Sequence, residues 1–162
     1  KETGTTPVSN KPIKPIIITK PMTLFEKDAC IIATPSHTTY FSYYLSYDHP
    51  VIGHQSHTIE LNLANFEQDI ATARTYGFEA EVNALLEKGL ALGGSLNNAL
   101  IIGDNDYINP PRFENECARH KLLDLIGDCW VLNRPIIGHV IGIKSGHQLN
   151  AKFVNHVYAN YC

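Results

Sequence analysis

The residues of this chain that can do chemistry are concentrated in segment 120–128, with the sequence HKLLDLIGD. His120, Asp124 and Asp128 follow one another at four-residue spacing, so on a helix one imidazole and two carboxylates project from the same face. A histidine and an aspartate one turn apart can share a divalent metal ion, as the two histidines of an HExxH helix do. The same spacing is also, and more commonly, that of a solvated His–Asp pair without a metal.

Three further segments are candidates for a chemical role. Segment 144–147 (KSGH) lies between an expected strand and an expected helix, so His147 is a candidate general acid or a solvated histidine at a helix start. Thr75 stands beside aromatic residues at an expected turn, where a hydroxyl is more often a cap than a catalyst. Segment 92–95 (LGGS) lacks the lysine that follows a phosphate-binding loop, so we expect a tight turn there.

Composition narrows the class of protein. The 162 residues are 44% hydrophobic and 18% charged, which fits one globular domain with its own core. A formal charge of -3 argues against nucleic acid as a partner, because such binding depends on cationic contacts with phosphate. No apolar run approaches the ~20 residues that span a bilayer, so we expect no transmembrane segment. The four cysteines form no CxxC pair, which favours a reducing, cytoplasmic location.

The elements that must position these residues follow from periodicity, caps and turn residues. Strands are expected over 30–34, 38–47, 58–63, 98–102 and 135–143, and helices over 66–73 (capped by Asn65), 79–88, 113–132 and 149–158. Most of the expected strands lie in the first part of the chain, and its last part is expected to be a helix, a strand and a helix. This order predicts an α+β fold, a two-layer sandwich of a mostly antiparallel sheet packed against helices. Residues 1–15 are expected to be an interdomain linker or a cut end, and residues 16–162 the domain.

Several motifs occur together in one order, namely RTYGF, LALGGSLNNALI, RFENECARHKLLDLIGD, IIGH and KSGHQLN, between residues 74 and 150. This combination closely resembles the UDP-3-O-acyl-N-acetylglucosamine deacetylases, the zinc amidohydrolases of lipid A biosynthesis. The resemblance extends back through DHPVIG at 48–53 and so covers nearly all of the chain beyond the linker.

The family has two similar α+β domains with the active site between them, and this chain resembles only the second, C-terminal one. The first domain supplies an adjacent Glu–His pair, in which the Glu is the general base and the His is a zinc ligand. In segment 59–61 (IEL) no histidine follows Glu60, so this segment holds no such pair. The resemblance therefore implies a Zn²⁺ cofactor whose third protein ligand comes from an absent N-terminal domain, and a chain that is inactive alone.

Carried over residue by residue, the resemblance makes His120 and Asp124 the zinc ligands of this half. His147 becomes the imidazole that stabilises the oxyanion or protonates the leaving amine, and Asp128 orients it. Thr75 becomes a hydrogen-bond donor to the developing oxyanion.

The same resemblance implies a set of substrate-binding residues. Lys121 and Lys144 would bind the diphosphate, and Tyr47 would pack on the uracil ring, with Tyr76 nearby. Residues 78–102 match the family's insert for the substrate's acyl chain. The residues expected along this passage are Val82, Leu96 and Ile101.

The expected function is therefore that of a hydrolase that removes acetate from UDP-3-O-acyl-N-acetylglucosamine, with that substrate and the N-terminal domain as partners. Two alternatives remain at this point. One is a non-catalytic domain that binds acyl chains or nucleotide sugars and retains the fold, and the other is a fusion with an acyl dehydratase. A preceding domain with a Glu–His pair in the parent gene would separate the first alternative from the enzyme.

Overall fold

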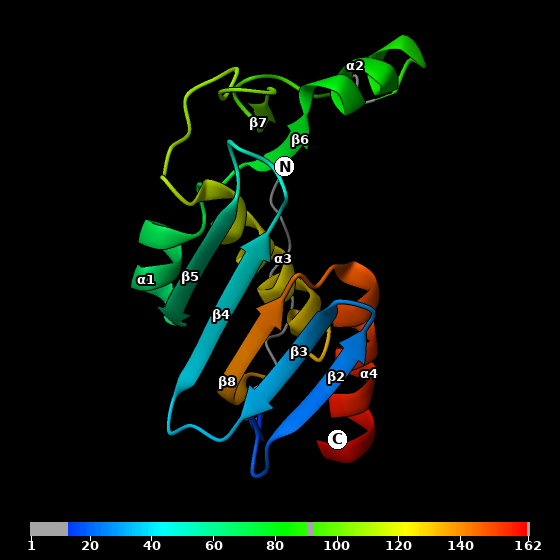
Figure 1. Cartoon of the computed structure of the whole chain (residues 1–162). Coiled ribbons are helices and arrows are strands. Elements are labelled where there is room, and N and C mark those ends of the chain that lie inside the picture. The colour runs from blue at the N-terminus through cyan, green and yellow to red at the C-terminus, as the bar shows by residue number, and fades with distance from the viewer. Residues whose placement is uncertain (1–12, 91–92, 162) are drawn as a thin grey trace, which may run out of the picture.

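The computed structural model describes residues 13–90 and 93–161 (Figure 1). Its strands are β1 (Ile16–Ile17), β2 (Met22–Glu26), β3 (Ala29–Thr34), β4 (Thr39–Ser46), β5 (His54–Glu60), β6 (Thr75–Phe78), β7 (Ala99–Ile102) and β8 (Ile136–Ile143). Its helices are α1 (Leu63–Asp69), α2 (Glu79–Glu87), α3 (Glu116–Trp130) and α4 (His147–Tyr161). Most of the predicted linker, residues 1–12, lies outside the described residues. No helix within the described ranges is both long and apolar enough to span a bilayer.

The main sheet has the strand order β2-β3-β8-β4-β5, with the short β1 paired to β8. β8 runs antiparallel to β3 and parallel to β4, so it is the central strand. It carries glycine where neighbours approach closely. A Cβ on Gly138, whose φ is +154°, would stand 2.8 Å from Cγ1 of Ile18, and one on Gly142 would stand 2.9 Å from Oγ of Ser145. Both glycines face the buried side of the sheet, so close packing on that side excludes a side chain at these two positions.

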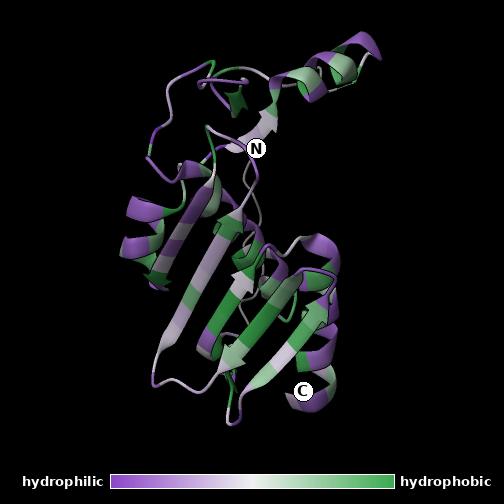
Figure 2. Ribbon diagram, in the orientation of Figure 1, coloured by the Kyte–Doolittle hydropathy of each residue, from purple (hydrophilic) through white to green (hydrophobic). Residues whose placement is uncertain are grey.

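Helices α3 and α4 cover one face of this sheet, which confirms the predicted two-layer α+β sandwich (Figure 1). The predicted apolar stripe of α3 is buried in the core, and its members are Cys117, Leu122, Leu125, Ile126 and Cys129. Apolar residues predominate in the central strands β3 and β8, whereas α1 and the edge strand β5 are mostly hydrophilic (Figure 2). The core therefore lies between the central strands and α3.

A small lobe projects beyond one end of the main sheet (Figure 1). It contains α2 and the parallel pair β6–β7. The lobe is fixed at its base by an ion pair between Arg74 and Glu116, which are 8% and 1% exposed, with Nε of Arg74 2.8 Å from Oε1 of Glu116. Arg74 also donates to the carbonyls of Leu96 and Pro110. One guanidinium thus joins both ends of the lobe to the first turn of α3.

Several predicted element boundaries were wrong. Residues 75–78 form strand β6 rather than a turn, because they pair with β7. Helix α1 begins at Leu63 rather than at residue 66, since the side chain of Asn62 accepts the backbone N–H of Asn65 and caps the helix. Helix α4 begins at His147 rather than at 149, and α3 begins at Glu116 rather than at 113.

Two further departures concern strands. The strand expected over 58–63 runs instead over His54–Glu60 at the sheet edge. Almost all of its residues are polar, and their burial alternates along the strand. Strands β1 and β2 were not predicted, although the burial of β2 alternates along its length.

Candidate active site

Helix α3 brings His120 and Asp124 together on one face, with Nε2 of His120 3.6 Å from Oδ1 of Asp124 and both side chains 18% exposed. Nδ1 of His120 lies 3.4 Å from the carbonyl oxygen of Ala73, which can only accept, so this nitrogen is the donor. That contact leaves the lone pair of Nε2 directed away from Ala73. A histidine held in this way is oriented as metal-binding histidines are.

The separation of Nε2 and Oδ1 suits two ligands of one metal ion. With metal–ligand bonds of about 2.0–2.1 Å at tetrahedral angles, two ligand atoms stand about 3.3 Å apart. The observed 3.6 Å is close to this separation. His120 and Asp124 can therefore hold two positions around one ion.

The second oxygen of Asp124 connects this pair to other groups. Nζ of Lys121 lies 2.7 Å from Oδ2, and Nε2 of His147 lies 3.9 Å from the same oxygen. Asp124 therefore stands between an ammonium group and two imidazoles.

His147 is held by Asp128, with Nδ1 2.7 Å from Oδ2 of the carboxylate. The side chain of His147 is 68% exposed, so its Nε2 is accessible. The turn before it contains Lys144 with a positive φ of 51°, and the buried hydroxyl of Tyr43 donates to the carbonyl of Ser145. Burial raises the pKa of Tyr43 well above its ordinary value, so this hydroxyl remains a donor.

A polar hollow of about 250 Å³ lies beside the His120–Asp124 pair. It is lined by Tyr47, Thr75, Tyr76, Gly77, Phe78, Glu81, His120, Lys121 and Asp124. Thr75, the first residue of β6, is exposed and lines the hollow together with residues of α3. The ring of Tyr76 packs edge-on against both Tyr47 and His120, at centroid distances of 6.4 and 6.3 Å. The hollow thus combines a hydroxyl, an imidazole, a carboxylate and an ammonium group.

A second hollow, of about 300 Å³, shares Tyr47, Tyr76 and Lys121 with the first. Lys144 also lines it and pairs with Asp28 on the turn between β2 and β3. The hydrogen bond from Lys144 holds the pKa of Asp28 below its usual value. Two ammonium groups beside aromatic rings can bind an anionic ligand that carries a flat ring.

The three residues predicted along the acyl passage lie in the small lobe, and none lines either hollow. Val82 packs on Gly77, because Cγ2 of Val82 stands 2.9 Å from where a Cβ of Gly77 would be. Ile101 is half-buried and paired in register with Gly77, whereas Leu96 is 56% exposed. The lobe also exposes three leucines of the α2 region, namely Leu85, Leu86 and Leu90.

Comparison with known proteins places this chain among relatives. The family model described as UDP-3-O-acyl N-acetylglycosamine deacetylase matches residues 2–159. The chain belongs to this deacetylase family. It is 43% identical over 162 residues to the UDP-3-O-acyl-N-acetylglucosamine deacetylase of Syntrophotalea carbinolica, a match that covers 99% of this chain and 52% of that protein.

Deacetylases of the same name give similar matches in other organisms. Identity is 42% over 144 residues to that of Leptospira biflexa, with 88% of this chain and 48% of the relative covered. It is 44% over 149 residues to that of Citrifermentans bemidjiense, with 91% and 49% covered. The chain therefore spans about half the length of the curated relatives that it matches.

Within this member of the deacetylase family, the candidate zinc ligands form a pair rather than a complete set. Over residues 13–90 and 93–161, no group of three or more histidine, cysteine, aspartate or glutamate side chains could hold a metal ion. His120 and Asp124 could therefore supply two ligand positions of one ion.

Sequence reasoning missed two features of this site. Asn150 is fully buried, and its Nδ2 donates to Oδ2 of Asp128 at 2.8 Å. Its position one turn after His147 was a signal that could have identified it. The carbonyl of Ala73, which orients His120, had no signal in the sequence because a backbone oxygen is present at every residue.

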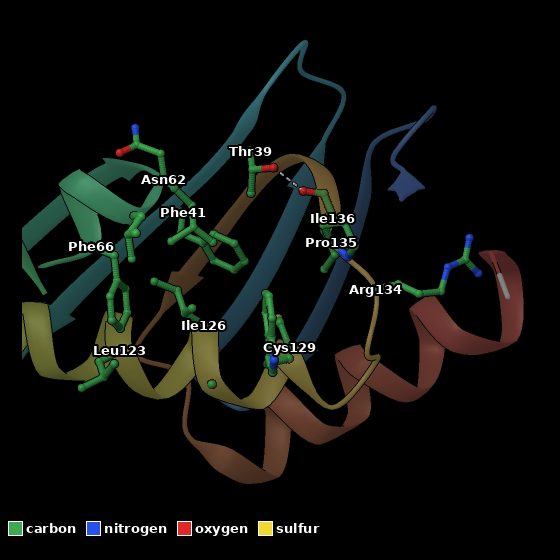
Figure 3. Close-up of a pocket in the computed structure, with 14 residues that line it drawn as sticks. Thr39, Phe41, Asn62, Phe66, Leu123, Ile126, Cys129, Arg134, Pro135 and Ile136 are labelled. Atoms are coloured by element: carbon green, nitrogen blue, oxygen red, sulfur yellow. Dashed lines mark hydrogen bonds between the residues drawn. The ribbon is translucent and has the colours of Figure 1, made fainter. Parts of the chain in front are cut away.

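A separate apolar groove of about 650 Å³, larger than either polar hollow, lies between α1, α3 and the start of β8. Phe41, Phe66 and Ile126 point into it, whereas Arg134 points away (Figure 3). Arg134 donates instead to the carbonyls of Lys14 and Pro15. The lining of this groove includes no carboxylate and no imidazole, so the candidate chemistry belongs to the smaller polar hollows.

Proposed function

We propose that this chain is the metal-binding half of a zinc-dependent hydrolase that removes acetate from UDP-3-O-acyl-N-acetylglucosamine in lipid A biosynthesis. The observation that carries the proposal is the connected array of His120, Asp124, Asp128 and His147 in a chain of the deacetylase family. A solvated surface pair would account for His120 and Asp124 alone, but not for a second His–Asp pair in contact with the first.

His120 and Asp124 would be the residues that hold the metal, with the lone pair of Nε2 kept free by the contact of Nδ1 with Ala73. A bound Zn²⁺ would supply a Lewis acid for the amide carbonyl and lower the pKa of a water molecule toward 7. We expect the third protein ligand and the general base to come from the half of the longer relatives that this chain does not span.

The chain's own acid–base contribution would be made by His147. Asp128 fixes the ring through Nδ1, so Nε2 is the atom that would donate to the oxyanion or to the leaving amine. The hydroxyl of Thr75, in the hollow beside His120, would donate to the developing oxyanion. Both groups would then act where negative charge develops.

The two adjoining hollows would bind the nucleotide part of the substrate. Lys121 and Lys144 would contact the diphosphate, and Tyr47 and Tyr76 would supply the aromatic surface for the base. The acyl chain would follow the apolar side chains of the small lobe, among them Val82, Leu96 and Ile101.

The proposal is tested on the full-length protein that contains this chain, by elemental analysis for zinc together with acetate release from UDP-3-O-acyl-N-acetylglucosamine. His120→Ala and Asp124→Asn should lose zinc and acetate release together. His156→Ala, which replaces an exposed histidine on α4, is the matched control and should keep both. Zinc retained by both site variants would refute the ligand assignment. A folded, metal-free wild type without hydrolysis would indicate the non-catalytic binding domain.

A further inference from the structure

We propose that Asn150 is a positioning residue for the acid–base pair, holding Asp128 so that His147 keeps a single orientation. The inference rests on the proposed function, because it assigns Asn150 a part in the same reaction. Asn150 does not face either polar hollow, and its influence would pass through the Asp128 carboxylate.

The geometry joins three side chains at one oxygen atom. Oδ2 of Asp128 accepts from Nδ2 of Asn150 at 2.8 Å and from Nδ1 of His147 at 2.7 Å. Asn150 and His147 are three residues apart on α4, so they approach Asp128 from the same helix face. Because a carboxylate only accepts, the amide must present its NH₂ group here, and its orientation is chemically fixed.

Exposure increases stepwise along this chain of contacts. Asn150 is 0% exposed, the side chain of Asp128 is 27% exposed and that of His147 is 68% exposed. An exposed imidazole moves freely among rotamers unless a partner holds it. The next contact of His147 is with Oδ2 of Asp124 at 3.9 Å, which is too long for a hydrogen bond. Asn150 is fixed in the core, and its hydrogen bond to Asp128 therefore restrains the orientation of His147.

The amide oxygen of Asn150 argues against a role of this residue in stability alone. Oδ1 of Asn150 is buried and has no hydrogen-bond partner among the described residues. A buried acceptor without a partner destabilises the fold, and an apolar side chain of similar volume would avoid that loss. The amide at this position therefore requires a reason other than packing, and its donor nitrogen, bonded to Asp128, supplies one.

The test uses the full-length protein and the variant Asn150→Leu, which keeps the volume and removes the donor. We expect kcat to fall about 10–100-fold, with KM and zinc content unchanged and the thermal midpoint equal or higher. In an Asp128→Asn background, Asn150→Leu should lower kcat by less than about twofold, because its route to His147 is already broken. Asn155→Leu, at an exposed asparagine of the same helix, should leave kcat at the wild-type value.

A second measurement does not depend on turnover. The NMR order parameter of the His147 ring should fall in Asn150→Leu and remain unchanged in Asn155→Leu. A wild-type order parameter in Asn150→Leu would overturn the inference, and so would an equal loss of kcat in the wild-type and Asp128→Asn backgrounds. Absence of acetate release from the wild type would refute the proposed function instead, and the ring measurement would still decide the role of Asn150.

Discussion

Replacing Glu116 by alanine should lower the free energy of unfolding by about 3–5 kcal/mol, the range for removing one partner of a buried ion pair. The Glu116 side chain is 0% exposed and the Arg74 side chain is 7% exposed. The carboxylate accepts from Nε, Nη2 and the backbone N–H of Arg74, at 2.8, 3.0 and 2.9 Å, and from the backbone N–H of Arg112 at 2.6 Å. Without it, a buried guanidinium loses its counter-charge and two backbone donors lose their acceptor.

The effect of Glu116 should also depend on pH. Burial by itself would raise the pKa of this carboxyl, but the hydrogen bonds from Arg74 and Arg112 hold the pKa below the ordinary value of 4.5. A group whose pKa is lower in the folded state stabilises the fold above the unfolded pKa, and this contribution is lost as pH falls through the folded pKa. The difference between wild type and Glu116→Ala should therefore be full at pH 7 and shrink on acidification below about pH 4.5.

Urea unfolding followed by circular dichroism measures both effects. Glu116→Gln keeps the volume and one acceptor and should lose less stability than Glu116→Ala. Glu114→Ala, at an exposed neighbour, is the control and should change the free energy of unfolding by less than about 0.5 kcal/mol. A loss below about 1 kcal/mol for Glu116→Ala at pH 7, the range of surface ion pairs, would refute the reasoning.

Three other predictions concern activity, the small lobe and the thiols. The 162-residue chain alone should release no acetate and should lose zinc to a chelator, since two protein ligands hold zinc weakly; a tight 1:1 complex that survives the chelator would contradict this. In the full-length protein, Leu96→Phe should reduce turnover of long acyl substrates more than of short ones, by about 0.8 kcal/mol for each CH₂ group that is no longer buried, and equal reductions would assign Leu96 to structure alone. Burial raises the pKa of Cys117 and Cys129 to about 12, so iodoacetamide should modify the half-buried Cys30 before these two, as peptide mass spectrometry would show.

The sequence predicted the α3 face because its geometry is local. His120 and Asp124 are one helical turn apart, and their proximity requires only that the helix forms. The pairing of His147 with Asp128 is a tertiary contact between two helices, so spacing could not reveal it. It was expected only because the motifs resembled those of a known family.

The errors have two causes, namely competition between similar local signals and contacts between residues that are distant in the sequence. Asn62 and Asn65 are both good N-caps, and only the folded chain selects Asn62. Strand β6 was predicted to be a turn because its pairing partner, β7, lies more than about twenty residues further along the chain. The support given to Asp128 by Asn150 was missed because burial of an amide depends on the packing of α4 against α3.

The central position of β8 has a consequence for synthesis of the protein. It is the last of the described strands in sequence order, yet it separates β3 from β4 and pairs with both. Until Ile136 and the residues after it have left the ribosome, β2–β3 and β4–β5 are two hairpins with no strand to join them. Strand pairs that are so far apart in the sequence form slowly. Until β8 pairs with them, the edges of β3 and β4 are free to pair with other chains. Nascent chains of this domain should therefore depend on chaperones until β8 has been made.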